Sequence, residues 1–178
     1  SGALTSFPTI SLAASAAGEQ KYSELSANLV IAGGGVGACA AALSALRNGL
    51  DVIMTEETDW IGGQLTSQGV PPDEHTWIET HGAPKSYRDY RNAVREYYKT
   101  NYPITDVAKS RPKLNPGNAT VSALCHEPRV SLAVLHDMLA PFISSGRFTL
   151  LLEHKISSAE YSGNKVKALR AQSLRSGR

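Results

Sequence analysis

The glycine-rich sequence at residues 33–38 has the residue types and the spacing that bind a pyrophosphate. It matches the pattern G-x-G-x-x-G/A, in which the first glycine permits a tight turn and the second lets the backbone approach a phosphate closely. The small third residue lets the following helix pack against the strands, and the N-terminus of that helix favours an anion. The predicted phosphate-binding residues are Gly33, Gly34, Gly35, Val36, Gly37 and Ala38.

The segments on either side of this turn are those that a dinucleotide site needs. Residues 28–32 are a short apolar run, typical of a buried parallel strand, and residues 36–48 predict a helix of small side chains. Residues 51–55 predict a second buried strand, which ends at Glu56 about 20 residues after the glycines. A carboxylate there accepts hydrogen bonds from both ribose hydroxyls and repels a 2′-phosphate, which argues against NADP.

The rest of the sequence predicts two helices, a third strand and a hairpin. We expect one helix from Ser86, as its N-cap, to about residue 99 and another that opens at Pro128 and runs to about residue 143. Residues 148–153 predict the third strand, and residues 156–161 and 165–173 a hairpin around Ser162-Gly163-Asn164. The expected fold class is α/β, a Rossmann-like doubly wound parallel sheet, incomplete in this chain, with a β-hairpin at the C-terminus.

Composition excludes several classes of protein. The 178 residues are 42% hydrophobic and 19% charged, typical of a folded domain, and the net charge of +2 comes from scattered basic residues, so we expect no nucleic-acid partner. No apolar run approaches the roughly 18 residues that span a bilayer, so we expect no membrane segment. Residues 1–26 are rich in Ser, Ala and Thr and predict a loosely ordered N-terminal arm; the remnant of a signal segment is the alternative.

The segment LVIAGGGVGACAAALSALRNGLDVIMTEE followed by WIGGQLTSQG resembles the FAD-dependent oxidoreductases of the glutathione-reductase structural class. The pair Gly62-Gly63 favours this class over an NAD-only dehydrogenase, because in the class such a pair lies beside the flavin cofactor. The resemblance is specific over residues 28–69 and looser over residues 125–175. It implies FAD as the cofactor and residues 27–178 as the N-terminal portion of an FAD-binding domain, with an irregular or helical insertion at about 70–125.

The resemblance also implies cofactor contacts for single residues. It places the adenosine ribose on Glu56, the ribityl chain near residues 62–64 and the flavin ring within reach of residues 66–67. Arg129 resembles a basic residue that the class keeps near the cofactor, and Ile156 falls where the class uses backbone groups against the adenine edge. Besides the glycine-rich turn, the implied cofactor-binding residues are Glu56, Glu57, Gly62, Gly63, Gln64, Thr66, Ser67, Arg129 and Ile156.

Candidates for proton transfer lie in a polar loop just past the segment that faces the flavin in the class. Because the ordinary histidine pKa is close to neutrality, we predict His75 and His81 as catalytic candidates; a solvated polar loop is the alternative. No pair of metal ligands has a recognised spacing, so no metal site is predicted. The helix from Ser86 is dense in Arg and Tyr, and we expect its tyrosines to pack and its arginines to be solvated rather than to bind an acidic substrate.

The two cysteines, Cys39 and Cys125, form no CxxC motif and predict no disulfide. Cys125-His126 is compatible with an activated thiol or a covalent flavin link, or with a buried cysteine beside a histidine that caps the helix at Pro128. The sequence Asn118-Ala119-Thr120 matches an N-glycosylation sequon. Together with the N-terminal segment it weakly favours secretion, and the sequence does not otherwise indicate a localisation.

The sequence therefore predicts an FAD-dependent oxidoreductase that oxidises a small organic substrate. An NAD-dependent dehydrogenase and a non-catalytic flavin- or nucleotide-binding module are the alternatives. A doubly wound FAD domain needs about five parallel strands, and only three are predicted here. We therefore expect a second polypeptide chain, separated by processing in a loop after Arg178, to supply the remaining strands and to pair with residues 28–32.

Overall fold

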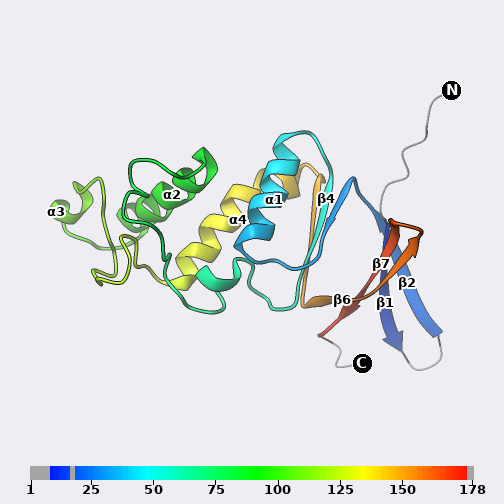
Figure 1. Cartoon of the computed structure of the whole chain (residues 1–178). Helices are drawn as coiled ribbons and strands as arrows, with labels where there is room; N and C mark the ends of the chain where they lie inside the picture. Colours follow the sequence, from blue (N-terminus) through cyan, green and yellow to red (C-terminus); the bar gives the residue numbers. More distant parts are fainter. Residues whose placement is uncertain (1–8, 17–18, 176–178) are drawn as a thin grey trace. The chain divides into compact units, whose positions relative to one another are not determined.

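The computed structural model describes residues 9–16 and 19–175, which are coloured in Figure 1. The chain divides into two compact units, of which the first comprises residues 1–61 and 139–178 and the second residues 62–138. The second unit is inserted between two adjacent strands of the sheet that lies in the first. Helix α4 (Pro128–Ser144) carries the chain from the second unit back to the first.

A three-stranded parallel sheet lies in the first unit. Its order is β3 (Leu29–Ile31), β4 (Val52–Glu56) and β5 (Phe148–Leu152). β4 pairs with both neighbours and is buried over its first four residues, as its unbroken apolar run predicts. The predicted strands and their parallel α/β arrangement of the Rossmann type are therefore confirmed, and β3 lies at an edge of the sheet as described.

Helix α1 (Val36–Arg47) connects β3 to β4 and packs against both strands, and Figure 1 shows α1 beside β4. Its buried side chains are small apart from two leucines, so the helix axis lies close to the sheet. Gly49, with φ of 88°, follows the helix in the left-handed conformation that commonly ends one. The predicted helix is confirmed, and so is the prediction that Pro128 opens α4.

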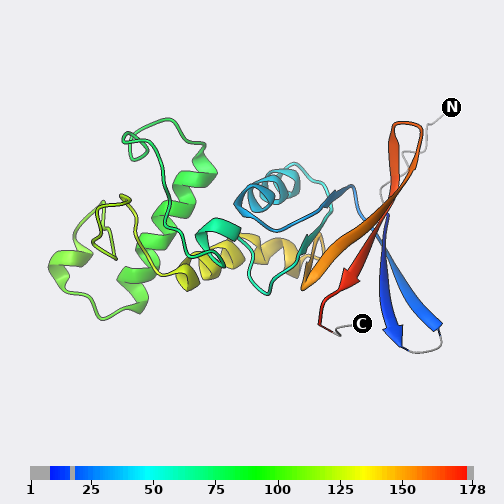
Figure 2. The same cartoon turned by 60° about the horizontal axis from the view of Figure 1, so that its bottom comes forward.

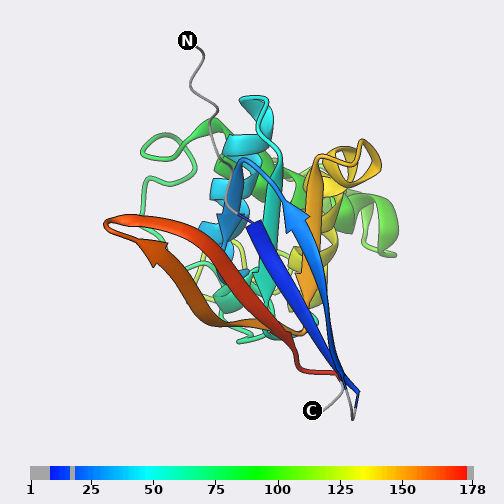
Figure 3. The ribbon, with the colours of Figure 1, turned by 90° about the vertical axis from the view of Figure 1, so that its right-hand side faces the viewer.

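A second sheet in the first unit has four strands in the order β2-β1-β7-β6, and these strands lie side by side at the front of Figure 3. β6 (His154–Ser162) and β7 (Lys165–Ser173) form the predicted hairpin. β1 (Thr9–Ala16) pairs in parallel with β7 and antiparallel with β2 (Glu19–Ser26). The expected loosely ordered arm is therefore wrong over these two strands, because the edge of β7 offers unpaired backbone groups that β1 satisfies; residues 1–8 lie outside the described part of the chain.

The two sheets of the first unit share a small hydrophobic cluster. Its buried members are Ala27 just before β3, Ile53 of β4 and Ala171 of β7. Apolar side chains of both sheets pack against these three residues, which fixes the start of β3 relative to the hairpin. The partly buried members are Leu25, Val30, Leu151, Ile156 and Leu169.

Figure 2 shows the elements of the second unit, in which a long loop leads from η1 (Gly63–Leu65) to α2 (Lys85–Asn101). The prediction that Ser86 caps α2 is wrong, because the N-cap position is Pro84 and Ser86 lies inside the helix. Lys85, the first residue of the helix, pairs through its ammonium with Asp89 one turn later, at 2.7 Å. A short helix that we did not predict, α3 (Asp106–Lys109), follows Thr105, whose side chain accepts from the Ala108 N–H.

Two arginines of α2 are buried in ion pairs with the loop that precedes the helix. Arg91 is 1% exposed and contacts both Glu74 and Glu79, while Arg95 is 3% exposed and contacts Glu79, with 2.5 Å between Nη2 and Oε1. The prediction that the arginines of this helix are solvated is wrong for these two. Burial is tolerated because two guanidinium groups meet two carboxylates. We call Glu74, Glu79, Arg91 and Arg95 the arginine–glutamate network.

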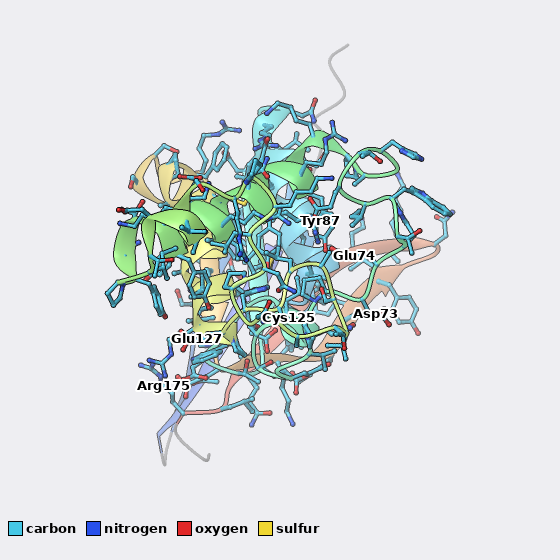
Figure 4. All side chains as sticks on the ribbon, turned by 90° about the vertical axis from the view of Figure 1, so that its left-hand side faces the viewer. Asp73, Glu74, Tyr87, Cys125, Glu127 and Arg175 are labelled. Atoms are coloured by element: carbon cyan, nitrogen blue, oxygen red, sulfur yellow. The ribbon has the colours of Figure 1, made fainter. Side chains whose placement is uncertain are left out.

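This network anchors the histidine loop (residues 73–82), which otherwise consists of turns. Tyr87 of α2 also donates a hydrogen bond to Glu74, and Figure 4 shows these two side chains next to each other. Burial and the neighbouring Glu74 carboxylate raise the pKa of Tyr87. Its hydroxyl therefore keeps its proton and donates at neutral pH.

The network predicts that acid destabilises the second unit through Glu79. Burial raises the pKa of Glu79, but hydrogen bonds and charges from Arg95 and Arg91 outweigh it and hold the pKa below its usual 4.5. A lowered folded-state pKa stabilises the fold above the unfolded pKa, and this stabilisation is lost as pH falls through the folded value. We expect Glu79→Gln to cost roughly 2–4 kcal/mol in urea unfolding at neutral pH and much less in acid.

The matched control is Glu96→Gln, which removes the exposed partner of Lys99 on the same helix. That change should alter the unfolding free energy by less than about 0.5 kcal/mol at either pH. Equal losses for the two variants at neutral pH would contradict the proposed role of the buried network.

Candidate functional site

The glycine turn (residues 33–38) is held against the C-terminal end of β4 by two side chains. The Gly33 N–H donates to Thr55 Oγ1 at 3.1 Å, and the Gly34 N–H donates to Glu56 Oε2 at 3.0 Å. Gly33 has φ of 100°, which other residues rarely adopt, so the tight turn predicted from the sequence requires a glycine there. The turn and Glu56 are therefore brought together, as the sequence predicts, within the first unit.

The three following glycine positions differ in what surrounds them. A Cβ atom on Gly34 would lie 2.7 Å from Glu56 Cβ, so this glycine is needed for packing. A Cβ atom on Gly35 or Gly37 would meet no atom within 4 Å. Gly35 therefore borders open space at the N-terminus of α1.

The start of α1 is suited to bind an anion from that open space. Gly35 is its N-cap residue, no side chain caps it among the described residues, and its first turn contains no acidic residue. The N–H groups of the first turn therefore lack a side-chain acceptor, and the helix dipole favours a negative charge there. A pyrophosphate fits this arrangement, because its charge and its need for close backbone approach match what the residues offer.

The Glu56 carboxylate is oriented by two backbone N–H groups and by the Thr58 hydroxyl, whose single proton is shared with the Trp60 carbonyl oxygen at 2.9 Å. Oε2 accepts from Gly34, and Oε1 accepts from the N–H and hydroxyl of Thr58 at 2.8 and 2.9 Å. Thr58 in turn accepts the Glu153 N–H through its carbonyl oxygen, at 3.1 Å, which ties the loop to the end of β5. The role of Thr58 was not predicted; its only sequence signal is a hydroxyl two residues past the acidic residue.

The predicted flavin-facing segment begins the second unit. Gly62 and Gly63 have φ of 102° and 50°, and a Cβ atom on Gly62 would lie 2.7 Å from both Leu135 Cδ1 and Thr66 Cγ2. Local packing therefore requires the first glycine of the pair. Thr66 is buried and Ser67 exposed, yet the hydroxyls of both lie 3.4 Å from the Gly63 carbonyl oxygen. Gln64 is exposed, and contacts of this segment with a cofactor stay a prediction.

Both candidate histidines lie beside Trp77 in the histidine loop. The ring centroids of His75 and Trp77 are 4.9 Å apart, and those of Trp77 and His81 are 6.0 Å apart with nearly parallel planes. Gly82, with φ of 83°, leaves room for the His75 ring, since a Cβ atom there would lie 2.8 Å from it. Trp77 is 52% exposed, so the stack is accessible from solvent.

The protonation of His81 can be assigned from its hydrogen bonds. The Thr80 hydroxyl donates to the Trp77 carbonyl oxygen at 2.9 Å, and the hydroxyl oxygen of Thr80 also lies 2.9 Å from His81 Nδ1. Because the single hydroxyl proton is already committed, His81 Nδ1 must carry the proton that joins it to Thr80. The neutral imidazole then has its lone pair on Nε2, which is the atom that can accept a proton.

The Cys125-His126 pair is not an activated thiol in this structure. Cys125 is buried, and its sulfur lies 3.6 Å from the Ser122 carbonyl oxygen. His126 instead bonds the Leu124 carbonyl oxygen through Nδ1 at 2.8 Å and the Ser131 hydroxyl through Nε2 at 2.5 Å. Burial lowers the pKa of His126, which keeps it neutral. The alternative of a buried cysteine therefore holds, and no disulfide joins the two cysteines.

The remaining predicted contacts lie on separate elements. Arg129 is exposed in the first turn of α4 and forms no ion pair with any described residue. Ile156 lies in β6 opposite Ala171, just before a register shift. Glu57 is exposed beside Glu56. Cofactor contacts of these three residues stay predictions.

The described residues include neither a cluster of metal ligands nor a membrane-spanning helix. Over residues 9–16 and 19–175, no group of three or more His, Cys, Asp or Glu side chains is placed to hold a metal ion. In the same part of the chain, no helix is both long and apolar enough to cross a membrane.

Comparison with known proteins identifies one family. The model of the family described as FAD dependent oxidoreductase matches residues 28–178. No curated protein matches the sequence.

Several solved structures resemble the fold at low sequence identity. An oxidized steroid monooxygenase bound to NADP is 15% identical with a TM-score of 0.38, over 82% of this chain and 24% of that one. Kutzneria sp. 744 ornithine N-hydroxylase, with FADred, NADP+ and L-orn, is 14% identical with a TM-score of 0.36, over 84% and 32%. Mycobacterium smegmatis Sdh1 in complex with UQ1 is 14% identical with a TM-score of 0.39, over 83% and 32%. The chain thus spans a quarter to a third of the length of these proteins.

The open space at Gly35 predicts a variant that loses the cofactor without unfolding. Gly35 has φ of −62° and ψ of 174°, which any residue adopts, so Gly35→Val should fold normally while its side chain fills the place of the pyrophosphate. We expect flavin per protein, measured by absorbance after gel filtration, to fall close to zero with an unchanged thermal midpoint of the apoprotein.

Gly37→Ala is the matched control. The added Cβ atom would also meet no atom within 4 Å, but residue 37 is one of the positions that the pattern G-x-G-x-x-G/A leaves open. It should retain the flavin and stabilise α1 by about 0.5–1 kcal/mol. Wild-type flavin content in Gly35→Val would show that the turn does not bind the cofactor.

Proposed function

The chain belongs to the FAD-dependent oxidoreductase family, and we propose that it binds FAD through the glycine turn and uses His81 to accept a proton from a small organic substrate. The cofactor of the family is FAD, and the fit of the turn to a pyrophosphate is the observation that supports this placement. When bound, the flavin supplies the redox chemistry, while the protein binds, orients and deprotonates.

The glycine turn and Glu56 are the residues that would hold the adenosine diphosphate half of FAD. The backbone of residues 35–38 would bind the pyrophosphate, and the oriented Glu56 carboxylate would accept from the ribose hydroxyls. Because the Thr58 and Gly34 donors already fix this carboxylate, little side-chain entropy is lost when the ribose binds.

His81 is the better placed of the two candidate histidines. Its Nδ1–H is directed to Thr80, so the basic Nε2 is available, and the residue is exposed. This is the arrangement of a general base whose tautomer is set by a hydrogen-bonded neighbour. His75 is more enclosed, with a buried Nδ1 that makes no hydrogen bond with described groups, and its ring supports Trp77.

The arginine–glutamate network serves this proposal by positioning the histidine loop. Glu74 immediately precedes His75, and Glu79 lies two residues before His81. Arg91 of helix α2 pairs with both carboxylates, so the loop that carries His75 and His81 is attached to the helix at two points. An oriented base raises the rate because less reorganisation precedes proton transfer.

Two other functions remain distinguishable by experiment. An NAD-dependent dehydrogenase would be colourless as purified, whereas bound oxidised flavin gives a yellow protein. A non-catalytic flavin-binding module would be yellow but would not be bleached by substrate. The exposed Trp77 and the oriented His81 favour an enzyme over the module, because a binding module needs no oriented base.

We predict that His81→Gln lowers turnover without loss of flavin. Removal of a general base should slow anaerobic bleaching of the flavin by substrate about 100-fold or more. Thr80→Val should give a smaller loss, about tenfold, because the tautomer is no longer fixed, and His75→Gln should also lower the rate.

The control is His136→Gln, on α4, which we expect to retain the wild-type rate. The flavin absorbance of each variant shows whether the cofactor site is intact. If the His75 and His81 variants both turn over like wild type, the histidine loop is only a solvated segment.

We also propose that a second polypeptide extends the parallel sheet at β3. In the described sheet β3 lies at the edge, and its three residues are apolar and only partly buried. Such an edge presents backbone donors and acceptors along one side and favours pairing with another strand.

Cross-linking tests the partner. Ala32→Cys, just after β3, should cross-link to a second chain with a thiol-reactive reagent, and intact mass should show both chains under native conditions. Ser158→Cys, exposed on β6, is the control, and the buried Cys39 and Cys125 should react little. A flavin-loaded monomer of this chain alone, with no cross-link from Ala32→Cys, would refute the proposal.

A further inference from the structure

A half-open pocket of about 340 Å³ lies in the second unit. The end of α2, the α3 segment and residues 114–118 contribute to its lining. Its volume falls within the range of small-molecule sites, roughly 300–1,000 Å³. All of its lining residues lie between positions 98 and 118, so the pocket belongs to this unit alone.

Two tyrosines form an anchored aromatic wall of the pocket. The ring centroids of Tyr98 and Tyr102 are 4.5 Å apart. The Tyr98 hydroxyl accepts from the Glu127 N–H at 2.8 Å, and the Tyr102 hydroxyl donates to the Glu127 carboxylate. This hydrogen bond raises the pKa of Tyr102 to about 12, so its hydroxyl stays neutral. The ring positions are therefore fixed before any ligand binds.

The floor of the pocket is apolar. Leu114 is buried, and Ile104 is partly buried. The Arg95 side chain donates from Nε to the Leu114 carbonyl oxygen at 3.0 Å, which joins the floor to the arginine–glutamate network. An aromatic ring bound here would bury one face against Leu114 and Ile104 and would stack against Tyr98 and Tyr102.

The rim carries positive charge. Arg111 lines the pocket, is exposed and forms no ion pair with any described residue. Lys109 and Lys113 lie on the same segment, where Asp106 is the one acidic residue, so residues 105–113 carry three positive charges and one negative, a net +2. Asn118 adds an amide to the lining and has a left-handed backbone, with φ of 49°.

We propose that this pocket binds a small carboxylate whose body is an aromatic ring. The ring packs on Tyr98 and Tyr102 above the apolar floor, and the carboxylate binds the Arg111 guanidinium, which matches it with two parallel donors. A neutral analogue gains the stacking but not the ion pair. A small anion without a ring gains the ion pair but not the stacking. This site does not depend on flavin binding or on His81.

Matched probes test both halves of the proposal. The purified protein is titrated with 4-hydroxyphenylacetate, with its alcohol analogue 2-(4-hydroxyphenyl)ethanol and with acetate, and binding is followed by calorimetry and by chemical shifts of the tyrosine rings. We expect 4-hydroxyphenylacetate to bind about tenfold tighter than the alcohol and about tenfold tighter than acetate, and its affinity to fall as salt is added.

Two variants alter the charge of the rim without touching the core. Arg111→Gln should remove the preference for the carboxylate over the alcohol, and Asn118→Asp should weaken the carboxylate about fivefold while leaving the alcohol unchanged. Asp tolerates the left-handed backbone, so this second variant keeps the fold. Arg47→Gln, on α1 in the first unit, is the control and should bind like wild type.

Four results would overturn the proposal. One is equal affinity for the aryl carboxylate and its alcohol, the second is binding of the carboxylate that Arg111→Gln leaves unchanged, and the third is acetate binding as tightly as the aryl acid. Absence of binding at millimolar probe concentration in the folded wild-type protein would also refute it.

Discussion

The hydrogen bonds of Gly33 and Gly34 to the side chains that end β4 are the interaction on which the cofactor site depends. A turn rich in glycine has high conformational freedom in the unfolded chain, and it costs free energy to order. Thr55 and Glu56 fix the turn at the point where α1 begins. The open space in front of Gly35 and the uncapped N-terminus of α1 are consequences of this arrangement, and both suit a pyrophosphate.

In the second unit, too, side chains hold an irregular segment in place, but they do so through ion pairs between full charges. The histidine loop lacks a backbone ladder of its own, and buried ion pairs with Arg91 and Arg95 hold it on α2. Such pairs contribute little net stability against an apolar core, but removal of one partner leaves an uncompensated buried charge. The network therefore defines one arrangement of the loop rather than adding much to overall stability. The network also contacts the pocket lined by Tyr98 and Tyr102, through the hydrogen bond from Arg95 to the Leu114 carbonyl oxygen.

Membership in the FAD-dependent oxidoreductase family is consistent with this division of roles. In the proposed function the first unit supplies the cofactor site, where specificity would come from the N–H groups at the start of α1 and from one carboxylate. In the proposed function the second unit supplies the side chains that meet a substrate; it is an insertion whose sequence is not constrained by the parallel sheet. A redox cofactor needs few catalytic groups from the protein, which explains why a single oriented imidazole suffices for the proposed chemistry.

The sequence by itself determined the parallel strands, α1 and the hairpin, because apolar runs, small residues and glycines act over short distances and have few alternative structures. It also indicated Glu56, since the acidic residue ends a strand at a characteristic distance from the turn. Only the tertiary structure decided that Arg91 and Arg95 are buried, that Ser86 does not cap α2, and that β1 and β2 replace a loose arm. Each of these depends on a partner distant in sequence, a carboxylate or a free strand edge, and local propensity carries no information about such partners.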